Sequence, residues 1–241
     1  MTLQYKPDIA ISIDVESTGR AVLKHSCRQL AAAAFYLNHL TPDGFNPQEW
    51  MIDSRCWAIA PQAGKEDDPV TMTFLHNQPG LMEEIEKTQI DVSEAIGSFC
   101  SWYDSLTERY NIRSIIASPS SFDYAWLISM VDVYKPDNVP HIALPIACRD
   151  LTTMKHIAEK IFGIDTRSNE SVLHRHGFGP KHNALNDALR QAWQYLILRS
   201  EMSQHKSLLR YGNKLSDHSM GVNSEATTSP VATKLESTTA S

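Results

Sequence analysis

The sequence lacks several features that would assign it to a class at once. Its four cysteines include no closely spaced pair, so neither a zinc site nor a disulfide framework is predicted, and a reducing compartment is expected. No apolar run approaches the roughly 18 residues that a membrane-spanning helix needs. Residues 1–7 also lack the pattern of a signal peptide. We therefore expect a cytoplasmic protein with no membrane partner.

An excess of positive charge is also missing. The chain has 22 Lys and Arg against 28 Asp and Glu, which gives a net charge of −6 and a sequence pI of about 5.9. Proteins that coat DNA or RNA present a basic surface to the phosphates, so the composition argues against a passive coat. It leaves room for an enzyme whose metal ions attract the phosphate.

The composition otherwise fits one globular domain followed by a tail. Hydrophobic residues make up 42% of the 241 residues and charged residues 21%, as in ordinary soluble domains. From Gly212 onward the last 30 residues hold eleven Ser or Thr and no aromatic residue. Such a segment buries too little surface to offset the entropy of ordering. We expect a domain over residues 1–211 and a disordered Ser/Thr-rich tail over 212–241.

Hydrophobic periodicity predicts both strands and helices within the domain. Apolar runs over residues 9–13, 50–59 and 112–117 indicate strands, and helical spacing is found over 93–109, 150–162 and 184–202. The segment 30–40 is ambiguous, because its four consecutive alanines favour a helix on propensity alone. The mixture of strands and helices predicts an α/β fold.

Paired carboxylates follow the first predicted strand. Asp14 and Glu16 are two residues apart at the end of the run 9–13, so on a strand their side chains point to the same face, roughly 6 to 7 Å apart. Like charges this close repel unless a cation lies between them. Hard divalent cations such as Mg²⁺ and Mn²⁺ prefer oxygen ligands, so the pattern predicts a metal site.

Two further acidic positions have the right local context to join this site. Asp123 follows a strand and a turn that contains Pro119, and open α/β sheets tend to carry their sites just past the carboxyl ends of strands. Asp187 lies on the last predicted helix, beside alanines that favour close packing on the sheet. A buried carboxylate there needs a partner or a cation. Neutral imidazole can take up a proton near neutral pH, so His182, in the loop before this helix, could act as a general base.

Together these residues resemble a known family. The segments 13–19, 121–124 and 182–188 look like the three motifs of the DEDDh branch of the DnaQ-like 3′-5′ exonucleases, in the same order and with similar spacing. The resemblance covers about residues 8–203 and implies a ribonuclease H-like fold, a mixed five-stranded sheet flanked by helices. It also implies a strand over 30–40. The segments 149–151 and 74–79 are similar to the exoribonuclease branch typified by phage and mycobacterial members.

The resemblance also implies a mechanism. Asp14, Glu16, Asp123 and Asp187 would hold two Mg²⁺ or Mn²⁺ ions about 3.5 to 4 Å apart, and His182 would deprotonate the attacking water. The substrate would be single-stranded RNA or DNA with a free 3′ end, released as nucleoside 5′-monophosphates. The expected contacts to the terminal nucleotide come from Ser17, Thr18 and Gly19, with base stacking on Phe122 or Trp126.

Several alternatives stay open at this point. RNA is favoured over DNA through the exoribonuclease-like segments, whereas an exodeoxyribonuclease would have the same site. Discrimination depends on how the pocket treats the 2′-hydroxyl, which the sequence does not reveal. Ser118 and Pro119 stand where many family members have Gly-Asn or Gly-His. A third alternative is a non-catalytic homologue that binds nucleic acid or protein. By analogy with the family, the protein is expected to form a homodimer.

Overall fold

The computed structural model describes residues 5–38, 47–166, 179 and 181–220. The chain divides into two compact units, Met1–Met202 and Ser203–Ser241. The first unit carries the sheet and all the elements that surround the candidate site. Within the second unit, the structure describes the continuation of the last helix.

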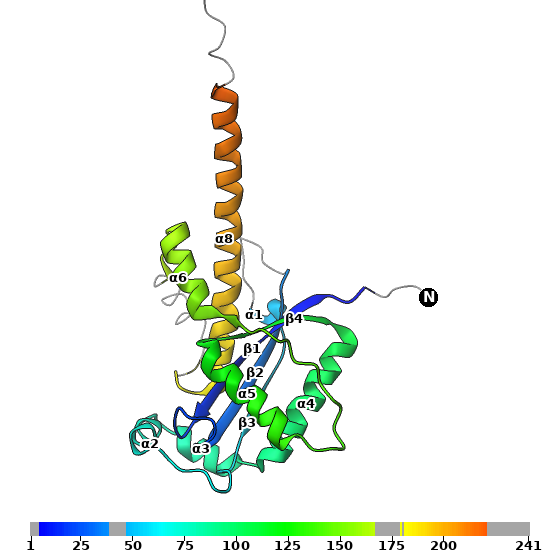
Figure 1. The fold of residues 1–241 in the computed structure, drawn as a ribbon, viewed down its shortest axis with the longest axis vertical. Coiled ribbons are helices and arrows are strands. Elements are labelled where there is room, and N and C mark those ends of the chain that lie inside the picture. The colour runs from blue at the N-terminus through cyan, green and yellow to red at the C-terminus, as the bar shows by residue number, and fades with distance from the viewer. Residues whose placement is uncertain (1–4, 39–46, 167–178, 180, 221–241) are drawn as a thin grey trace, which may run out of the picture. The chain divides into compact units, whose positions relative to one another are not determined.

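The first unit is built on one mixed sheet (Figure 1). Its strand order is β3-β2-β1-β4-β5, and the bounds are β1 (Asp8–Ser17), β2 (Cys27–Tyr36), β3 (Met51–Ala58), β4 (Asn111–Ala117) and β5 (Arg149–Asp150). The β1–β2 and β2–β3 pairs are antiparallel, whereas β1–β4 and β4–β5 are parallel. The predicted mixed five-stranded sheet and α/β class are confirmed.

Helices connect and flank these strands. The described helices are α1 (Pro47–Trp50), α2 (Pro69–His76), α3 (Leu81–Thr88), α4 (Val92–Arg109), α5 (Ser120–Tyr134), α6 (Leu151–Phe162) and α8 (Ala184–Met220). The helices predicted over 93–109 and 150–162 match α4 and α6 to within one residue at each end. Their first turns are capped by Asp91 and Asp150, whose carboxylates accept backbone hydrogen bonds from Ser93 and Thr153.

The two faces of the sheet carry different helices. On β1, Ile9, Ile11 and Ile13 point to one face, where they pack with buried residues of α4 and α5. Ala10 points to the other face, which packs with residues of α6 and α8. Because side chains alternate along a strand, Asp14 and Glu16 lie on the same side as Ala10 and face α8. The sheet therefore aims both carboxylates toward the last helix.

The alanines of β2 explain how α8 approaches the sheet. Ala31 and Ala33 are fully buried and form a small cluster with Ala184 and Ala188 of α8. Small side chains on both surfaces leave little between helix and strand, so the backbone of α8 packs close to β2 beside β1. This packing resolves the ambiguity that helix propensity left. The strand expected over 30–40 is observed with bounds Cys27–Tyr36, so it begins three residues earlier and ends before Leu37 and Asn38. Residues 39 and 40 lie outside the described residues.

The last helix is longer than the periodicity predicted. Helix α8 continues to Met220, so the first nine residues of the expected disordered tail are helical in the structure, and residues 221–241 lie outside the described residues. A helix satisfies its backbone hydrogen bonds locally, so the absence of aromatic residues that suggested disorder does not prevent one. Among the described residues, no helix is long and apolar enough to cross a membrane.

Candidate active site

The predicted acidic residues converge from three elements of the fold. Asp14 and Glu16 lie near the end of β1, Asp123 lies in the first turn of α5, and Asp187 lies in the first turn of α8. Strands β1 and β4 are parallel, so β1 and the β4–α5 turn reach the same edge of the sheet. All four residues, together with His182, line one cavity of about 350 Å³. The structure therefore brings together the five residues that the sequence singled out.

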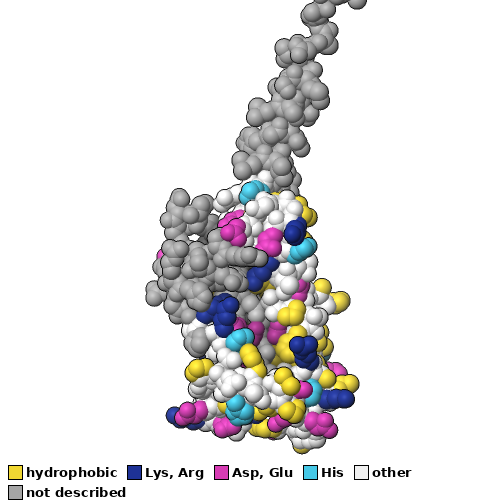
Figure 2. Space-filling model, turned by 90° about the vertical axis from the view of Figure 1, so that its left-hand side faces the viewer, with side chains coloured by type: hydrophobic (Ala, Val, Ile, Leu, Met, Phe, Trp, Pro, Cys, Tyr) yellow, Lys and Arg dark blue, Asp and Glu magenta, His cyan; other side chains and the backbone are white. Residues whose placement is uncertain are grey.

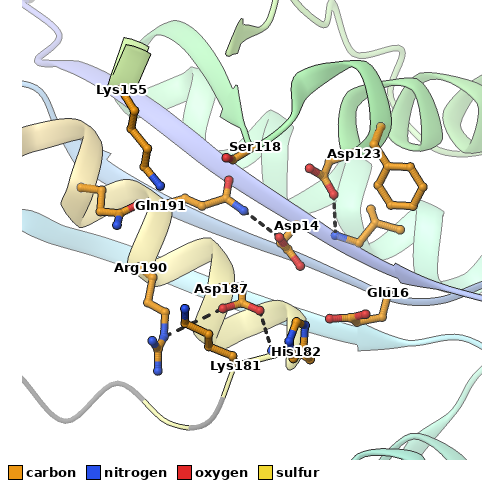
Figure 3. Close-up of a pocket in the computed structure, with 13 residues that line it drawn as sticks. Asp14, Glu16, Ser118, Asp123, Lys155, Lys181, His182, Asp187, Arg190 and Gln191 are labelled. Atoms are coloured by element: carbon orange, nitrogen blue, oxygen red, sulfur yellow. Dashed lines mark hydrogen bonds and ion pairs between the residues drawn. The ribbon is translucent and has the colours of Figure 1, made fainter. Parts of the chain in front are cut away.

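Asp14 is held by the last helix. Gln191 Nε2 donates a hydrogen bond of 2.6 Å to Asp14 Oδ1, and both side chains are more than nine-tenths buried. Gln191 is one helical turn beyond Asp187, so its side chain lies on the same face of α8 and reaches the same cavity. Its carbonyl oxygen, Oε1, is buried and has no hydrogen-bond partner among the described residues. This amide orients one of the carboxylates that point into the site (Figure 3).

Asp123 is fixed against β1 by a backbone contact. Its Oδ1 accepts a hydrogen bond of 3.1 Å from the backbone N–H of Val15, between the two acidic residues of the strand. The other oxygen, Oδ2, is buried and has no hydrogen-bond partner within the part of the chain that the structure describes. A buried carboxylate oxygen left unpaired is costly unless a cation or water satisfies it. The geometry of Asp123 therefore fits a residue that shares a cation with Asp14 and Glu16.

His182 and Asp187 are joined at the start of α8. Asp187 Oδ2 accepts a hydrogen bond of 2.7 Å from the backbone N–H of His182. This contact holds His182 in the left-handed region, with φ at 63°, a conformation that non-glycine residues rarely adopt. Arg190 lies one turn further along, with Nε 3.9 Å from Asp187 Oδ1. The loop histidine is thus turned toward the carboxylates rather than away from them (Figure 3).

Basic side chains also line this cavity. Lys155 of α6, Lys181 and Arg190 all line it, and in Figure 3 they lie on the side away from Glu16. Figure 2 shows this face of the molecule, on which acidic, basic and histidine side chains gather close together beside hydrophobic ones. The cavity is therefore lined by both carboxylates and cations, and Arg190 lies beside Asp187.

Burial and mutual repulsion raise the pKa values of the carboxylates, which disfavours their simultaneous ionisation. Burial, followed by the negative charges of Asp187 and Asp123, raises the pKa of Glu16 to about 8. Burial also raises the pKa of Asp123 to about 7, against the opposing hydrogen bond from Val15. The pKa of Asp14 is raised well above its ordinary value by burial and by its three acidic neighbours. A bound cation would reverse these shifts, since it favours the ionised form.

The donor set fits a divalent cation. Among the described residues, Glu16, His182 and Asp187 each offer a possible ligand atom, and these atoms lie within 4.8 Å of one another. The unpaired oxygen of Asp123 and the acidic neighbours of Asp14 add oxygen donors around the same cavity. Oxygen-rich sites of this kind suit Mg²⁺ or Mn²⁺. His182 lies close enough to this group to be a candidate ligand, a role that the sequence did not suggest.

The residues expected to contact substrate fall into two groups. Ser17, Gly19 and Phe122 line a second cavity of about 470 Å³, which meets the first at Glu16 and Phe122. Gly19 approaches the ring of His25 so closely that an added Cβ would lie 2.5 Å from it, so a side chain there would displace that ring.

Thr18 and Trp126, which were also expected to contact the substrate, are instead buried. Thr18 is fully buried, and its hydroxyl accepts a hydrogen bond from Ser26 N–H and donates one to Glu66 O. It serves the loop after β1, and it lines neither cavity. Trp126 is 2% exposed within the core between the sheet and α5, because it lies one turn beyond Phe122 on the face of α5 that packs inward. Of the two stacking candidates, Phe122 is the one that lines the cavities.

Some of the residues that line the two cavities lie outside the acidic sequence motifs. Gln191 and Arg190 are four and three residues beyond Asp187, so the helical period alone places them near that carboxylate. Lys155 and Phe74 reach the cavities from α6 and α2. No spacing relative to the acidic motifs identifies these two, since only the tertiary fold brings α2 and α6 to this edge of the sheet.

Comparison with known proteins gives matches at the level of structure. No family model and no curated protein matches the sequence. A structure of exonuclease I, described in relation to processivity, superposes with a TM-score of 0.57 and 12% identity, over 85% of this chain and 43% of that one. The RNase domain of the yeast Pop2 protein superposes with a TM-score of 0.53 and 16% identity, over 81% of this chain and 78% of that one.

A third similar structure is the nuclease domain of 3′hExo, described as a DEDDh family member bound to rAMP. It has a TM-score of 0.51 and 12% identity, over 81% of this chain and 93% of that one. The chain spans less than half the length of the exonuclease I structures that it resembles. At these identities the likeness concerns the fold. The sheet order, the flanking helices and these neighbours together show that the chain has the ribonuclease H-like α/β fold found in DEDDh nucleases.

Proposed function

We propose that the protein is a metal-dependent 3′-5′ exonuclease that hydrolyses single-stranded nucleic acid to nucleoside 5′-monophosphates. The observation that carries this proposal is the meeting of Asp14, Glu16, Asp123 and Asp187 with His182 in one cavity. The fold neighbours support it, since they include an exonuclease I in complex with a dT13 oligonucleotide. A binding protein without activity has no need for two buried and two partly buried carboxylates beside a strained histidine.

The four carboxylates would hold two divalent cations, Mg²⁺ or Mn²⁺. Cations bound there would lower the pKa of water and stabilise the negative charge that develops during displacement at phosphorus. Gln191 and the backbone of Val15 orient Asp14 and Asp123. The backbone contact between His182 and Asp187 ties the histidine to the same group.

The protein side chains then supply proton transfer and positioning. His182 takes a proton from the attacking water, whose oxygen bonds to phosphorus while the bond to the leaving 3′ oxygen breaks. That oxygen takes up a proton and becomes the new 3′ end. Ser17, Gly19 and Phe122 line the second cavity, where the terminal nucleotide would bind. Lys155 and Lys181 offer positive charge to the phosphates on the other side.

RNA is the favoured substrate in this proposal, and an exodeoxyribonuclease with the same site is the alternative. RNA is supported by the exoribonuclease-like segments 149–151 and 74–79, which form the β5–α6 junction and the end of α2. The Asp150 carboxylate accepts hydrogen bonds from Ser120 and Thr153, so this junction anchors the start of α5 close to the site. A second alternative is a non-catalytic homologue, which an activity assay would identify by the absence of cleavage.

The deciding experiment uses matched 5′-labelled RNA and DNA oligonucleotides with Mn²⁺, Mg²⁺ or EDTA, resolved on a sequencing gel. We expect a ladder that shortens from the 3′ end, disappears with EDTA and is absent for Asp14→Ala. The substrate with the faster ladder identifies the preferred sugar. If neither substrate shortens under any metal condition, the protein is a binding homologue and the proposal fails.

A further inference from the structure

The imidazole of His182 is held by an unusual partner. Its backbone is fixed by Asp187, yet among the described residues no hydrogen bond joins its ring nitrogens to a protein group. The ring instead packs edge to face against Phe74, with the centroids 4.7 Å apart and the planes at 83°. A general base is usually oriented by a hydrogen bond from a third group. Here an aromatic contact takes that place.

Phe74 also belongs to the second cavity. Its side chain is 42% exposed, and it lines this cavity together with Phe122 and the loop that holds Ser17 and Gly19. The same ring therefore contacts His182 and leaves apolar surface open where the terminal nucleotide would bind. Nucleobases stack on exposed aromatic rings of this kind. A base in the second cavity would restrict the motion of the Phe74 ring.

The helix that carries Phe74 is fixed to the same part of the site. Asp68 caps α2 through a hydrogen bond of 2.7 Å from Thr71 N–H. The backbone N–H of Asp68 also donates to the carbonyl of Thr18 at 2.8 Å, in the loop directly after β1. Next to Phe74, Leu75 is buried and packs against α3. The backbone of α2 is thereby anchored, and the remaining freedom lies in the Phe74 side chain.

We propose that Phe74 is a positioning residue that couples stacking of the terminal nucleobase to the orientation of His182. The inference rests on the exonuclease function proposed above. When the second cavity is empty, the Phe74 ring is free to change rotamer. The imidazole of His182, which packs against this ring, then changes its orientation as well. A stacked base fixes the ring and holds His182 toward the attacking water. Hydrolysis is then fast only when the terminal nucleotide carries a base.

The test compares two single-stranded oligonucleotides of the sugar that the wild-type protein prefers, one with a normal 3′-terminal nucleotide and one whose terminal nucleotide lacks the base. Single-turnover rates at saturating enzyme separate the chemical step from binding. The variants are Phe74→Leu, which keeps apolar bulk without a ring, and Phe74→Tyr, which keeps the ring. Val70→Ala is the control, because Val70 lies on the same helix, is 79% exposed and lines neither cavity.

We expect the wild-type protein to cleave the abasic terminus about tenfold more slowly at saturation, the size of effect that one aromatic contact can supply. Phe74→Leu should cleave the normal terminus at that lower rate and lose the difference between the two substrates. Phe74→Tyr should restore both the rate and the difference, and Val70→Ala should match the wild type. A Phe74→Leu protein with a raised KM and an unchanged saturating rate would show that Phe74 only binds substrate, and would overturn the proposal.

A second measurement does not depend on turnover. The imidazole protons of His182, assigned in NMR spectra by their loss in His182→Gln, are recorded in metal-free protein with a nucleoside 5′-monophosphate or with ribose 5-phosphate. We expect the nucleotide to shift them and the sugar phosphate to leave them in place, with no difference between the two in Phe74→Leu. Equal shifts from both compounds in the wild type would overturn the coupling. If the wild-type protein shortens no oligonucleotide, the proposed function fails separately, and this spectrum still tests the contact.

Discussion

Gln191 Nε2 donates a hydrogen bond of 2.6 Å to Asp14 Oδ1 across the interface between α8 and β1. The bond favours the ionised form of Asp14, against the burial and the acidic neighbours that raise its pKa. It also fixes which way the carboxylate turns. Outer contacts of this kind commonly change metal affinity by about 10- to 100-fold when they are removed.

Replacing Gln191 by Leu should therefore weaken Mn²⁺ binding by about 10-fold or more, because Asp14 loses its donor and becomes harder to ionise. Isothermal titration with Mn²⁺ measures the change. The matched control is Gln194→Leu, since Gln194 lines the same cavity and is as deeply buried but makes no hydrogen bond to Asp14. Equal losses in the two variants would mean that Gln191 acts through packing alone.

Replacing His182 by Ala should lower the saturating rate by about 10²- to 10⁴-fold, the usual contribution of a general base. Mn²⁺ affinity should stay close to that of the wild type. His182 also lies near Glu16 and Asp187 in a geometry that a cation could share. A large loss of Mn²⁺ affinity in His182→Ala, measured by titration, would assign the histidine to the metal and not to proton transfer.

The metal-free protein should lose stability as the pH rises from about 5 to 8. Because the folded-state pKa of Glu16 is about 8 and that of Asp123 about 7, the folded state keeps protons in this range that the unfolded state has released. Stability then falls with pH, by on the order of a few kcal/mol. Chemical denaturation at several pH values with EDTA checks this. Glu16→Gln should flatten the dependence, and an unchanged slope would contradict the raised pKa.

Replacing Lys155 and Lys181 together by Gln should raise KM several-fold and leave the saturating rate nearly unchanged. Both residues line the cavity on the side away from Glu16, where they can attract phosphates without touching the reacting atoms. The dependence of KM on salt concentration should also flatten, because fewer counterions are released on binding. Steady-state kinetics at low and moderate salt provide the measurement, and an unaltered salt dependence would place the nucleic acid elsewhere.

Replacing Ala33 by Val should reduce both stability and activity. The added methyl groups would push on Ala184 and Ala188, at a cost of about 1 to 3 kcal/mol for overpacking, and would displace the helix that carries Asp187. Ala32→Val is the control, because Ala32 is equally buried but faces the core formed with α4 and α5. We expect both variants to lose stability in thermal unfolding, whereas only Ala33→Val should also lose Mn²⁺ affinity.

The relative placement of the acidic residues depends on local spacing that can be read from the sequence. Asp14 and Glu16 share a face because a strand has a period of two, and Asp187 and His182 are fixed by the start of one helix. The starts of α4 and α6 also follow from local signals, since Asp91 and Asp150 are their N-caps. Local signals of this kind need no knowledge of what packs nearby.

The parts that the sequence missed depend on contacts between distant segments. The hydroxyl of Thr18 could in principle contact a substrate, but it is hydrogen-bonded to the backbone of Ser26 and Glu66. Local propensity left the alanines of β2 ambiguous, and only the family resemblance implied the strand, which packs against α8. Phe74 meets His182 only because α2 folds back over the loop after β1. Each outcome was decided by tertiary packing.

The hydrogen bond between Asp14 and Gln191 joins residues that are 177 positions apart. A contact of such high sequence separation can form only after residues up to Gln191 have been made, and closing so long a loop costs entropy. During synthesis the first strand leaves the ribosome long before the last helix. A growing chain can therefore build its sheet while it is still incapable of cleavage, and any nuclease activity arises only once the final helix has docked.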